Sequence, residues 1–350
     1  MRKTRWMVYT LLIVTLAAGL LLASCSQPAP GGAKPAQKAL IFGTQPIGTS
    51  TYVVGTGLGS VVEKYTGIKV IVQPMATTPL LYNEMAANRM DVALMVQGNS
   101  YLAFRGEEEF KQMGARSYRQ LGTGNANAYF WVTRPDTGIK SIKDFVGKKV
   151  MYISAVSPPT TEPFRLSLEY NGVLDKVTSL NRSSMEAAAE ALIEKKADVI
   201  GGPYGSFAYN VKEATGIVVI PLDEQVSKYI QQKRPDLVAV PGTFEAGYYA
   251  LPQKMTTVSR VKEMTTPPAM SDDVAYAITK AVYDHPEDTK AIHRDVGEFS
   301  LDNALAFSFF IPTHPGAVKY YKEKNMWTKE MEDNQQKLLA LEKDLASKKK

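Results

Sequence analysis

The sequence predicts an α/β protein with two lobes, each built on a parallel sheet that helices cover on both faces. Short apolar runs alternate with helical segments along the chain, which is typical of parallel sheets. This order occurs twice, and Gly67 and Gly172, Thr78 and Ser184, and Asp91 and Asp198 are landmarks about 105–107 residues apart. About 310 residues follow the N-terminal segment. That length exceeds what one core usually takes, so it favours two lobes.

The first unit is predicted to contain a strand, a loop rich in Thr and Ser, a helix, a strand, a helix and a buried strand. These segments cover residues 39–43, 44–51, 52–65, 68–73, 77–89 and 91–96. Gly67 is the expected stop of the first helix. Thr77 and Thr78 before Pro79 are typical of a helix start. The last strand ends in Gln97-Gly98-Asn99-Ser100.

The second unit repeats this order between residues 149 and 203. It has a strand, a loop rich in hydroxyl groups and proline, a helix that stops at Gly172, a short strand, a second helix and a last strand. Ser183 and Glu186 have capping-box spacing, which predicts the start of the second helix. Ligands of open α/β sheets bind beyond the carboxyl ends of the strands, where helix N-termini attract anions. The polar turns in these places predict a ligand cleft between the lobes.

The chain is expected to pass between the lobes twice, outward over residues 128–133 and back over 241–258. This assigns 39–130 together with 256–350 to lobe 1, and 131–255 to lobe 2. Residues 272–285 are expected to form a helix of lobe 1, and 320–350 one long amphipathic helix on its outside. Its apolar side chains are expected to pack on the parent domain: Met331, Leu338, Leu341 and Leu345.

The N-terminus has the features of a lipoprotein signal. Arg2, Lys3 and Arg5 precede an apolar run of about 16 residues, which is short of the ~20 that span a bilayer. Cys25, the only cysteine of the chain, follows Leu22-Ala23-Ser24 and resembles the lipidated cysteine of a bacterial lipobox. Residues 1–24 are therefore expected to be removed, and 25–38 to tether an extracytoplasmic domain to a membrane. An ordinary signal peptide with an incidental cysteine is the alternative.

The charge of the body argues against nucleic acid as a partner. Removing residues 1–24 lowers the formal net charge from +6 to +3, and Lys348, Lys349 and Lys350 account for that remainder. Nucleic-acid binding requires a clustered basic face, which a near-neutral body does not offer.

No motif predicts an enzyme, a metal or a cofactor. His285 and His293 are expected on the surface, and His314 is expected to cap a helix or to hold the C-terminal segment. Ser259-Arg260-Val261-Lys262 matches the Ser-x-x-Lys motif, but a four-residue motif with two fixed positions often occurs by chance. Gly55, Gly57 and Gly59 lack dinucleotide spacing, so close helix packing explains them better.

Four stretches point to a family: 42–44 with 48–52 and Gly55, 83–96, 138–150, and 314–323 (HPGAVKYYKE). Together they resemble the TAXI class of extracytoplasmic solute receptors, which serve TRAP-type secondary transporters. The last stretch is the most specific to this class. The stretch 138–150 also occurs in receptors of other importers, so it supports the fold more than the family.

The resemblance implies a type II periplasmic binding fold that closes on its ligand. It implies delivery to a membrane permease with fused subunits, driven by an ion gradient, and ligands that are small organic anions such as glutamate or dicarboxylates. By analogy, the expected ligand-binding residues of lobe 1 are Thr44, Thr49, Ser50, Thr51, Tyr52, Thr77, Thr78, Gln97, Asn99 and Ser100. Those of lobe 2 are Ser154, Ser157, Thr160, Thr161, Gly202 and Tyr204. Arg182, beside a helix start, is the best candidate for pairing a ligand carboxylate.

Two departures from the family weaken the expectation of an anion held by main-chain amides. Ser50 stands where the family usually has a second glycine. Ser157-Pro158-Pro159-Thr160 replaces a Ser-Gly step and removes two N–H donors. Five apolar side chains are expected in the core rather than at the ligand: Met75, Met95, Tyr129, Phe130 and Trp131.

Two other binding functions share the predicted fold. One is a receptor for an ABC importer of the thiamine-precursor or sulfonate type, and the segment 314–317 favours the TRAP class over it. The other is a lipoprotein that senses a solute and signals to a membrane partner.

Overall fold

The computed structural model describes residues 39–348, except 155–157, 235–236, 238–239 and 306–308. The predicted signal peptide, Cys25 and the tether lie outside the described residues. Within the described part of the chain, no helix combines the length and the apolar composition that a membrane span requires.

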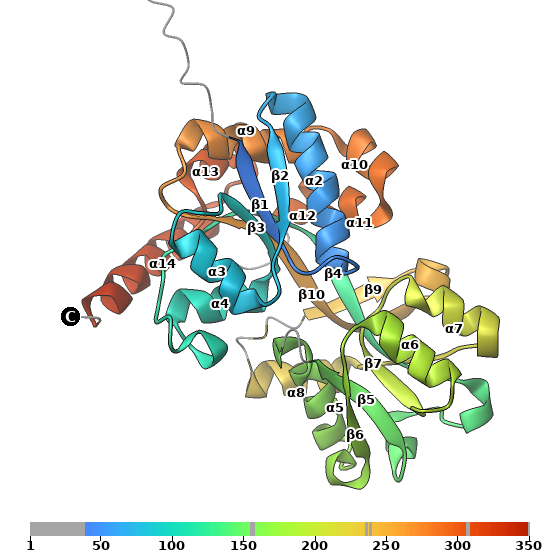
Figure 1. The fold of residues 1–350 in the computed structure, drawn as a ribbon. Helices are drawn as coiled ribbons and strands as arrows, with labels where there is room; N and C mark the ends of the chain where they lie inside the picture. Colours follow the sequence, from blue (N-terminus) through green and yellow to red (C-terminus); the bar gives the residue numbers. More distant parts are fainter. Residues whose placement is uncertain (1–38, 155–157, 235–236, 238–239, 306–308, 349–350) are drawn as a thin grey trace, which may run out of the picture. The chain divides into compact units, whose positions relative to one another are not determined.

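Strands of the first sheet lie in the order β2-β1-β3-β10-β4 (Figure 1). β1 is parallel to β2 and β3, and β10 is antiparallel to β3, β4 and β9. The bounds of these strands are β1 Leu40–Thr44, β2 Val70–Pro74, β3 Val92–Val96, β4 Arg119–Thr133, β9 Val240–Phe244 and β10 Met255–Thr266. The helices of this part are α2 Ser50–Thr66, α3 Thr78–Ala86, α4 Gln97–Arg105, η1 Glu108–Phe110, α9 Asp272–Tyr283, α10 Pro286–Ile292, α11 Arg294–Gly297, α12 Leu301–Ala304, α13 Pro315–Glu323 and α14 Lys329–Ser347.

The second sheet continues the path as β4-β7-β5-β6, and β8 also pairs with β4. β5 is parallel to β6 and β7, whereas β7 and β8 are antiparallel to β4. Its strands are β5 Lys149–Ser154, β6 Thr178–Arg182, β7 Val199–Pro203 and β8 Val218–Pro221. Its helices are η2 Pro135–Thr137, η3 Ile142–Phe145, η4 Pro158–Thr160, α5 Glu162–Tyr170, η5 Leu174–Lys176, α6 Met185–Ile193, α7 Phe207–Thr215, α8 Glu224–Lys233 and η7 Tyr248–Ala250.

One long strand, β4, belongs to both sheets. Its residues 119–128 pair with β10, and its last five residues pair with β7 and β8. Residues 128–133, where the chain is predicted to pass from lobe 1 to lobe 2, lie where β4 changes from pairing with β10 to pairing with β7. The division into residues 39–130 with 256–350 and 131–255 stays a prediction.

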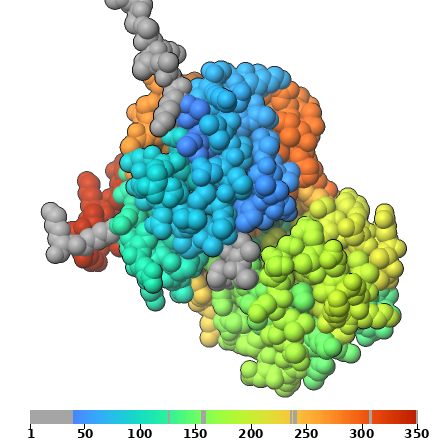
Figure 2. Space-filling view, viewed as in Figure 1, coloured from blue at the N-terminus to red at the C-terminus, as the bar shows by residue number. Residues whose placement is uncertain are grey.

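The period of two along each strand builds a core on both faces of both sheets. In β3, Val92 and Leu94 face α2, α9 and α13, whereas Ala93 and Met95 face α3 and α4. In the same way, Trp131 of β4 joins the cluster with α5 and α8, and Phe130 joins the cluster with α6 and α7. In the space-filling view, α2, β2 and α3 contribute to the blue and cyan part of the surface (Figure 2). The five apolar residues expected in the core are buried, as predicted.

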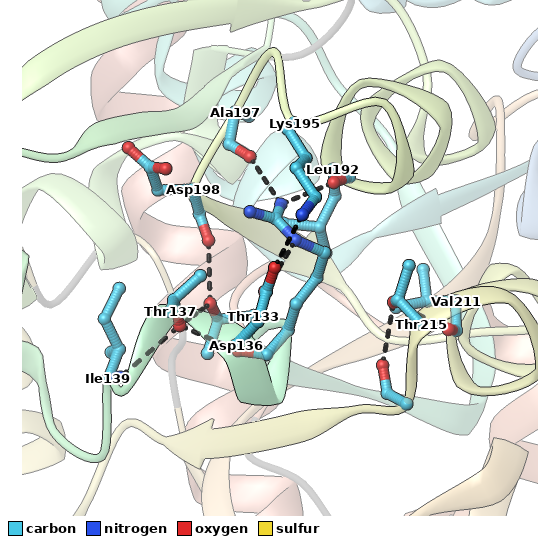
Figure 3. A network of polar contacts seen from close by, with 12 residues as sticks. Thr133, Asp136, Thr137, Ile139, Leu192, Lys195, Ala197, Asp198, Val211 and Thr215 are labelled. Carbon is cyan, nitrogen blue, oxygen red and sulfur yellow. Dashed lines mark hydrogen bonds and ion pairs between the residues drawn. The ribbon is translucent and has the colours of Figure 1, made fainter.

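Arg134, directly after β4, shows how this fold satisfies a buried cation. Its Nη1 donates to the carbonyls of Leu192 and Ala197, and its Nε donates to Asp136 at 3.0 Å. Figure 3 shows these acceptors around one guanidinium, with Lys195 also paired to Asp136. The network fixes the passage from β4 to η2 against α6.

The glycines of α2 confirm the prediction of close packing. A Cβ on Gly55 would lie 2.4 Å from Thr44 Cγ2, one on Gly57 2.6 Å from Val296 Cγ2, and one on Gly59 3.0 Å from Val70 Cγ1. The helix therefore lies closer to β1, β2 and α11 than any larger side chain would permit.

Several predicted elements are confirmed. The helix expected to stop at Gly172 is α5, and the helix expected at 272–285 is α9, which ends at Tyr283. Gly67 and Gly172 have the positive φ expected after a helix. His314 caps α13, because its Nδ1 accepts from the N–H of Gly316. The apolar positions of α14 pack on the parent domain, and His285 and His293 are only half-buried.

Four predicted elements need correction. The helix expected over 320–350 is two helices, α13 and α14, separated near Asn325, whose φ is +58°. The second helix of the first unit ends at Ala86 rather than at 89. Ser184, not Ser183, caps α6, because it is the Ser184 hydroxyl that accepts from Ala187 N–H. The stretch 97–100 was predicted as the end of a strand, but it is the first turn of α4.

Candidate functional site

The threonine hydroxyl groups of the first strand-to-helix turn bond to other groups of the same turn. Thr49 caps α2 by accepting from Tyr52 N–H, and its own hydroxyl donates to the Pro46 carbonyl at 2.7 Å. Thr51 donates to Gln45 Oε1 at 3.0 Å. These threonines hold the loop in place, so their contacts support a structural role.

The other candidate residues on β1, α2 and α3 are Thr44, Thr77, Thr78, Tyr52 and Ser50. Thr44 is fully buried and donates to the Gln45 carbonyl, and Gln45 Nε2 donates to Thr78 at 3.4 Å. Thr77 is exposed and caps α3, with its hydroxyl accepting from Leu80 N–H. Tyr52 is half-exposed on the first turn of α2. Ser50 differs from all of these, because it bonds to two charged groups described below.

In the second sheet, Ser157 lies outside the described residues. Thr161 accepts from Ser154 N–H at 2.9 Å and so closes the loop after β5. Tyr204 packs edge-on against Phe130 in the core, and burial raises the pKa of its hydroxyl. Gly202 is buried beside Arg182, where a Cβ would come within 3.2 Å of the guanidinium carbon.

Three helices that follow strands have no side-chain cap among the described residues, and these are α4, α5 and α7. The first turn of α4 is completely buried, and it includes the candidates Gln97, Asn99 and Ser100. Neither polar atom of the Asn99 side chain has a hydrogen-bond partner among the described residues. Ser100 instead bonds to the Tyr82 hydroxyl. Asn99 is therefore the candidate of this turn that is suited to a ligand.

Arg260 and Lys262 bring two buried positive charges to β10, and both are fully buried. They are two residues apart on one strand, which places them on the same face. Lys262 pairs with Val96, the residue before α4, and Arg260 pairs with Asn127 of β4. The two cations therefore lie at the edge where β3 ends and α4 begins.

The Arg260 guanidinium is only partly satisfied. Its Nε donates to the Leu237 carbonyl at 3.0 Å and its Nη1 to the Pro159 carbonyl at 2.8 Å. Its Nη2 is buried and has no hydrogen-bond partner among the described residues. Arg134, by contrast, bonds to a carboxylate and two carbonyls (Figure 3). A buried guanidinium with an unpartnered donor is suited to an anionic ligand.

Arg182 approaches the same short helix, η4, from β6. Its Nη2 lies 3.5 Å from Thr160 Oγ1, and its Nε donates to the Gly201 carbonyl at 3.1 Å. The hydrogen bonds of Arg182 and Arg260 go to carbonyl and hydroxyl oxygens, whereas Glu186 and Glu109 act on them only as nearby charges. Burial lowers the pKa of Arg182 to about 10. Adjacent residues of η4 thus hold two guanidinium groups together, which costs free energy unless an anion balances them.

Lys262 is held by polar groups from two other elements. Its ammonium donates to Ser50 Oγ at 2.9 Å and to Asn127 Oδ1 at 2.7 Å. Burial lowers the pKa of Lys262 to about 8, and Asp295 partly opposes this shift. The ammonium group is therefore largely charged at pH 7.

Tyr129 completes the cluster on β4. Its side chain is fully buried, and its hydroxyl has no hydrogen-bond partner among the described residues. Because Asn127 and Tyr129 are two residues apart on the strand, they face the same side. We define the cationic cluster as Arg182, Arg260 and Lys262 with the hydroxyl and amide groups around them: Ser50, Asn127, Tyr129 and Thr160.

The structure therefore brings together Ser50, Thr160 and Arg182 of the predicted site and adds residues that the sequence analysis missed. Arg260 and Lys262 lie in a stretch that was read only as a weak catalytic motif. The two cations lie within a run that has strand character, Met255–Thr266. Cations at alternate positions of an otherwise apolar and hydroxyl-rich strand were the available signal.

The cluster offers charge and hydrogen-bond donors, with no arrangement suited to hold a metal. Among the described residues, no group of three His, Cys, Asp or Glu side chains could bind a metal ion. The three cations and the Tyr129 hydroxyl can together donate to the oxygens of a small anion.

Comparisons with known proteins place the chain in a family and a fold. The periplasmic binding protein BugD is similar in structure, with a TM-score of 0.52 and 12% identity over 82% of this chain and 93% of that chain. MatC from Rhodopseudomonas palustris with bound malate has a TM-score of 0.50 and 12% identity over 74% of this chain and 88% of that chain. These likenesses confirm the predicted two-lobed type II periplasmic binding fold. The NMT1-like family matches residues 42–324, and the chain belongs to this family.

Proposed function

We propose that this protein is an extracytoplasmic solute-binding receptor that captures a small organic anion and delivers it to a membrane transporter. The observation that carries the proposal is the cationic cluster. Arg182, Arg260 and Lys262 are at least nine-tenths buried and converge from both sheets. A bound carboxylate would accept from the buried Arg260 Nη2, which has no hydrogen-bond partner among the described residues, and would add negative charge beside the three cations.

Such a protein is a binder rather than an enzyme. The cluster contains cations, hydroxyl groups and an amide, but no paired nucleophile and base. Malate bound to MatC, a protein of the same fold, agrees with a carboxylate ligand. The ligand proposed here is a carboxylate such as glutamate or a dicarboxylate.

Binding measurements on the purified protein test this proposal. Isothermal titration calorimetry with malate, 2-oxoglutarate, glutamate and isethionate should detect at least one of these anions. Glucose and putrescine serve as neutral and cationic controls. The proposal would be wrong if only the controls bound.

The transporter class is a finer proposal. The stretch 314–323 resembles TAXI receptors, so we propose a TRAP permease with fused subunits as the partner, and a lipid on Cys25 as the membrane anchor. The alternative is a receptor for an ABC importer of the sulfonate or thiamine-precursor type, because the stretch 138–150 also occurs in receptors of other importers. Uptake of the ligand by cells should stop when the ion gradient is dissipated if the TRAP proposal holds. Uptake that instead follows the ATP supply would support the ABC importer.

A further inference from the structure

Asp295 of α11 is a buried carboxylate that links the cationic cluster to a distant part of the chain. It is 5% exposed. Its Oδ2 accepts from Ser50 Oγ at 3.2 Å, and its Oδ1 accepts from the Tyr249 hydroxyl at 2.7 Å. Ser50 in turn accepts from Lys262. One carboxylate thus lies one hydroxyl group away from the Lys262 ammonium.

The hydrogen-bond directions in this chain are fixed by chemistry. An ammonium group only donates and a carboxylate only accepts, so the single Ser50 proton points to Asp295 and its lone pairs face Lys262. Ser50 therefore orients Lys262 rather than donating to a ligand. Replacing this serine by glycine would remove that link.

The segment that carries Tyr249 is held in an unusual conformation. Tyr249 and Ala250 have φ of +43° and +65°, a region that costs free energy for residues other than glycine. The Arg294 guanidinium, next to Asp295, lies 4.2 Å from the Tyr248 ring centre and 5.5 Å from that of Tyr249. Hydrogen bonding and cation–π contact from α11 together hold η7 in place.

We infer that Asp295 is a positioning residue, which keeps the Lys262 ammonium charged and oriented for an anion and ties this state to η7 through Tyr249. The inference rests on the proposed function, because it assigns Lys262 to anion binding. The charged and titratable groups around the link are Lys262, Asp295 and Arg294, together with Tyr248, Tyr249, Glu298 and His293, whose Nδ1 accepts from Asp295 N–H.

The main test compares the pH profiles of malate affinity for the wild type and for Asp295→Asn between pH 6 and 9.5, where malate stays a dianion. The pKa of Lys262 is about 8, so wild-type affinity should fall as the pH rises through that value. Asp295→Asn removes the charge that raises this pKa, so the fall should move to lower pH. Asp288→Asn, in a surface pair with Lys64, is the matched control and should keep the wild-type profile.

Tyr249→Phe separates the two parts of the inference, because it removes only the hydroxyl. We expect this variant to bind malate several-fold more weakly at every pH, without moving the profile. Tyr276→Phe, which loses a surface hydrogen bond to Glu323, is its control. Profiles that coincide for Asp295→Asn and Asp288→Asn would overturn the positioning role. Tyr249→Phe with wild-type affinity would overturn the link to η7.

A measurement without ligand separates this inference from the proposed function. A lysine with a depressed pKa makes the unfolded state bind more protons, so the free energy of unfolding rises with pH between the folded and unfolded pKa values. For wild type this window begins near pH 8, and for Asp295→Asn it should begin lower. Ser50→Ala should shift it in the same direction, which keeps the test open if Asp295→Asn does not fold. If no anion binds but the windows differ as stated, the proposed function fails and the positioning role stands.

Discussion

At the scale of the residue, Arg260 is the side chain on which anion binding should depend most. It reaches η4 through Pro159 and keeps one buried donor without a partner among the described residues. We expect Arg260→Gln to lower malate affinity by about 100-fold, since the loss of a charged hydrogen bond in a buried site costs roughly 3 kcal/mol. Calorimetry at pH 7 would measure this loss. Arg89→Gln, in an exposed pair with Glu84, is the control, and equal affinities of the two variants would contradict the prediction.

Glu263, the neighbour of Lys262, faces the opposite side of β10 and is expected to affect stability instead. Burial raises its pKa to about 8, and Ser100 partly opposes the shift. Because the folded pKa is the higher one, its contribution to stability is complete below the unfolded value of about 4.5 and is lost as the pH rises through 8.

Glu263→Gln should therefore raise the free energy of unfolding at pH 8, by an amount on the order of 2 kcal/mol, and change it little at pH 4.5. Urea denaturation at both pH values measures the difference. Glu108→Gln, whose carboxyl lies on an exposed stretch, provides the comparison. A gain that is the same at both pH values would show that Glu263 is not the titrating group.

At the scale of the element, helix caps separate structural hydroxyl groups from binding ones. Thr49 caps α2 and also donates to Pro46, so Thr49→Ala should lower the free energy of unfolding by about 1 kcal/mol. Thr56→Ala in the exposed middle of the same helix should cost nothing, because alanine favours helices. Chemical denaturation of both variants tests this. The structural role would be refuted if Thr49→Ala kept full stability but lost malate affinity.

Element prediction from the sequence succeeded where periodicity and stop signals agreed, as in α5 and α9. It was wrong where a strand passes directly into a helix, as at Val96 and Gln97, because no cap or glycine marks that boundary. β10 is not predicted as a buried strand because Arg260, Lys262 and Glu263 lie within it, and such residues are typical of a surface. Only tertiary contacts show that these charges are buried, so the candidate site could be predicted for Ser50, Thr160 and Arg182 but not for β10.

At the scale of the whole molecule, the cationic cluster takes groups from both sheets. Arg182 and Thr160 belong to the second sheet, whereas Ser50 belongs to the first, and β10 supplies Lys262. The cores of the two sheets are separate clusters of apolar side chains. An anion bound to residues of both should therefore couple the stabilities of two cores that are otherwise joined by β4 and β10.

Hydrogen exchange of backbone amides should show this coupling directly. Saturating malate should slow exchange both in β1 and β3 and in β5 and β7. A ligand at 100 times its Kd adds about 2.7 kcal/mol to the free energy of any opening reaction that requires the ligand to dissociate. The amides of α14, on the outside of the first core, would follow the first sheet. Arg260→Gln at the same malate concentration serves as the control, because a 100-fold weaker affinity should leave only about 0.4 kcal/mol of added protection. Exchange of this variant without malate gives its own baseline. Protection confined to one sheet would mean that the ligand contacts only that sheet, and the proposed convergence of Arg182, Arg260 and Lys262 on a single anion would be wrong.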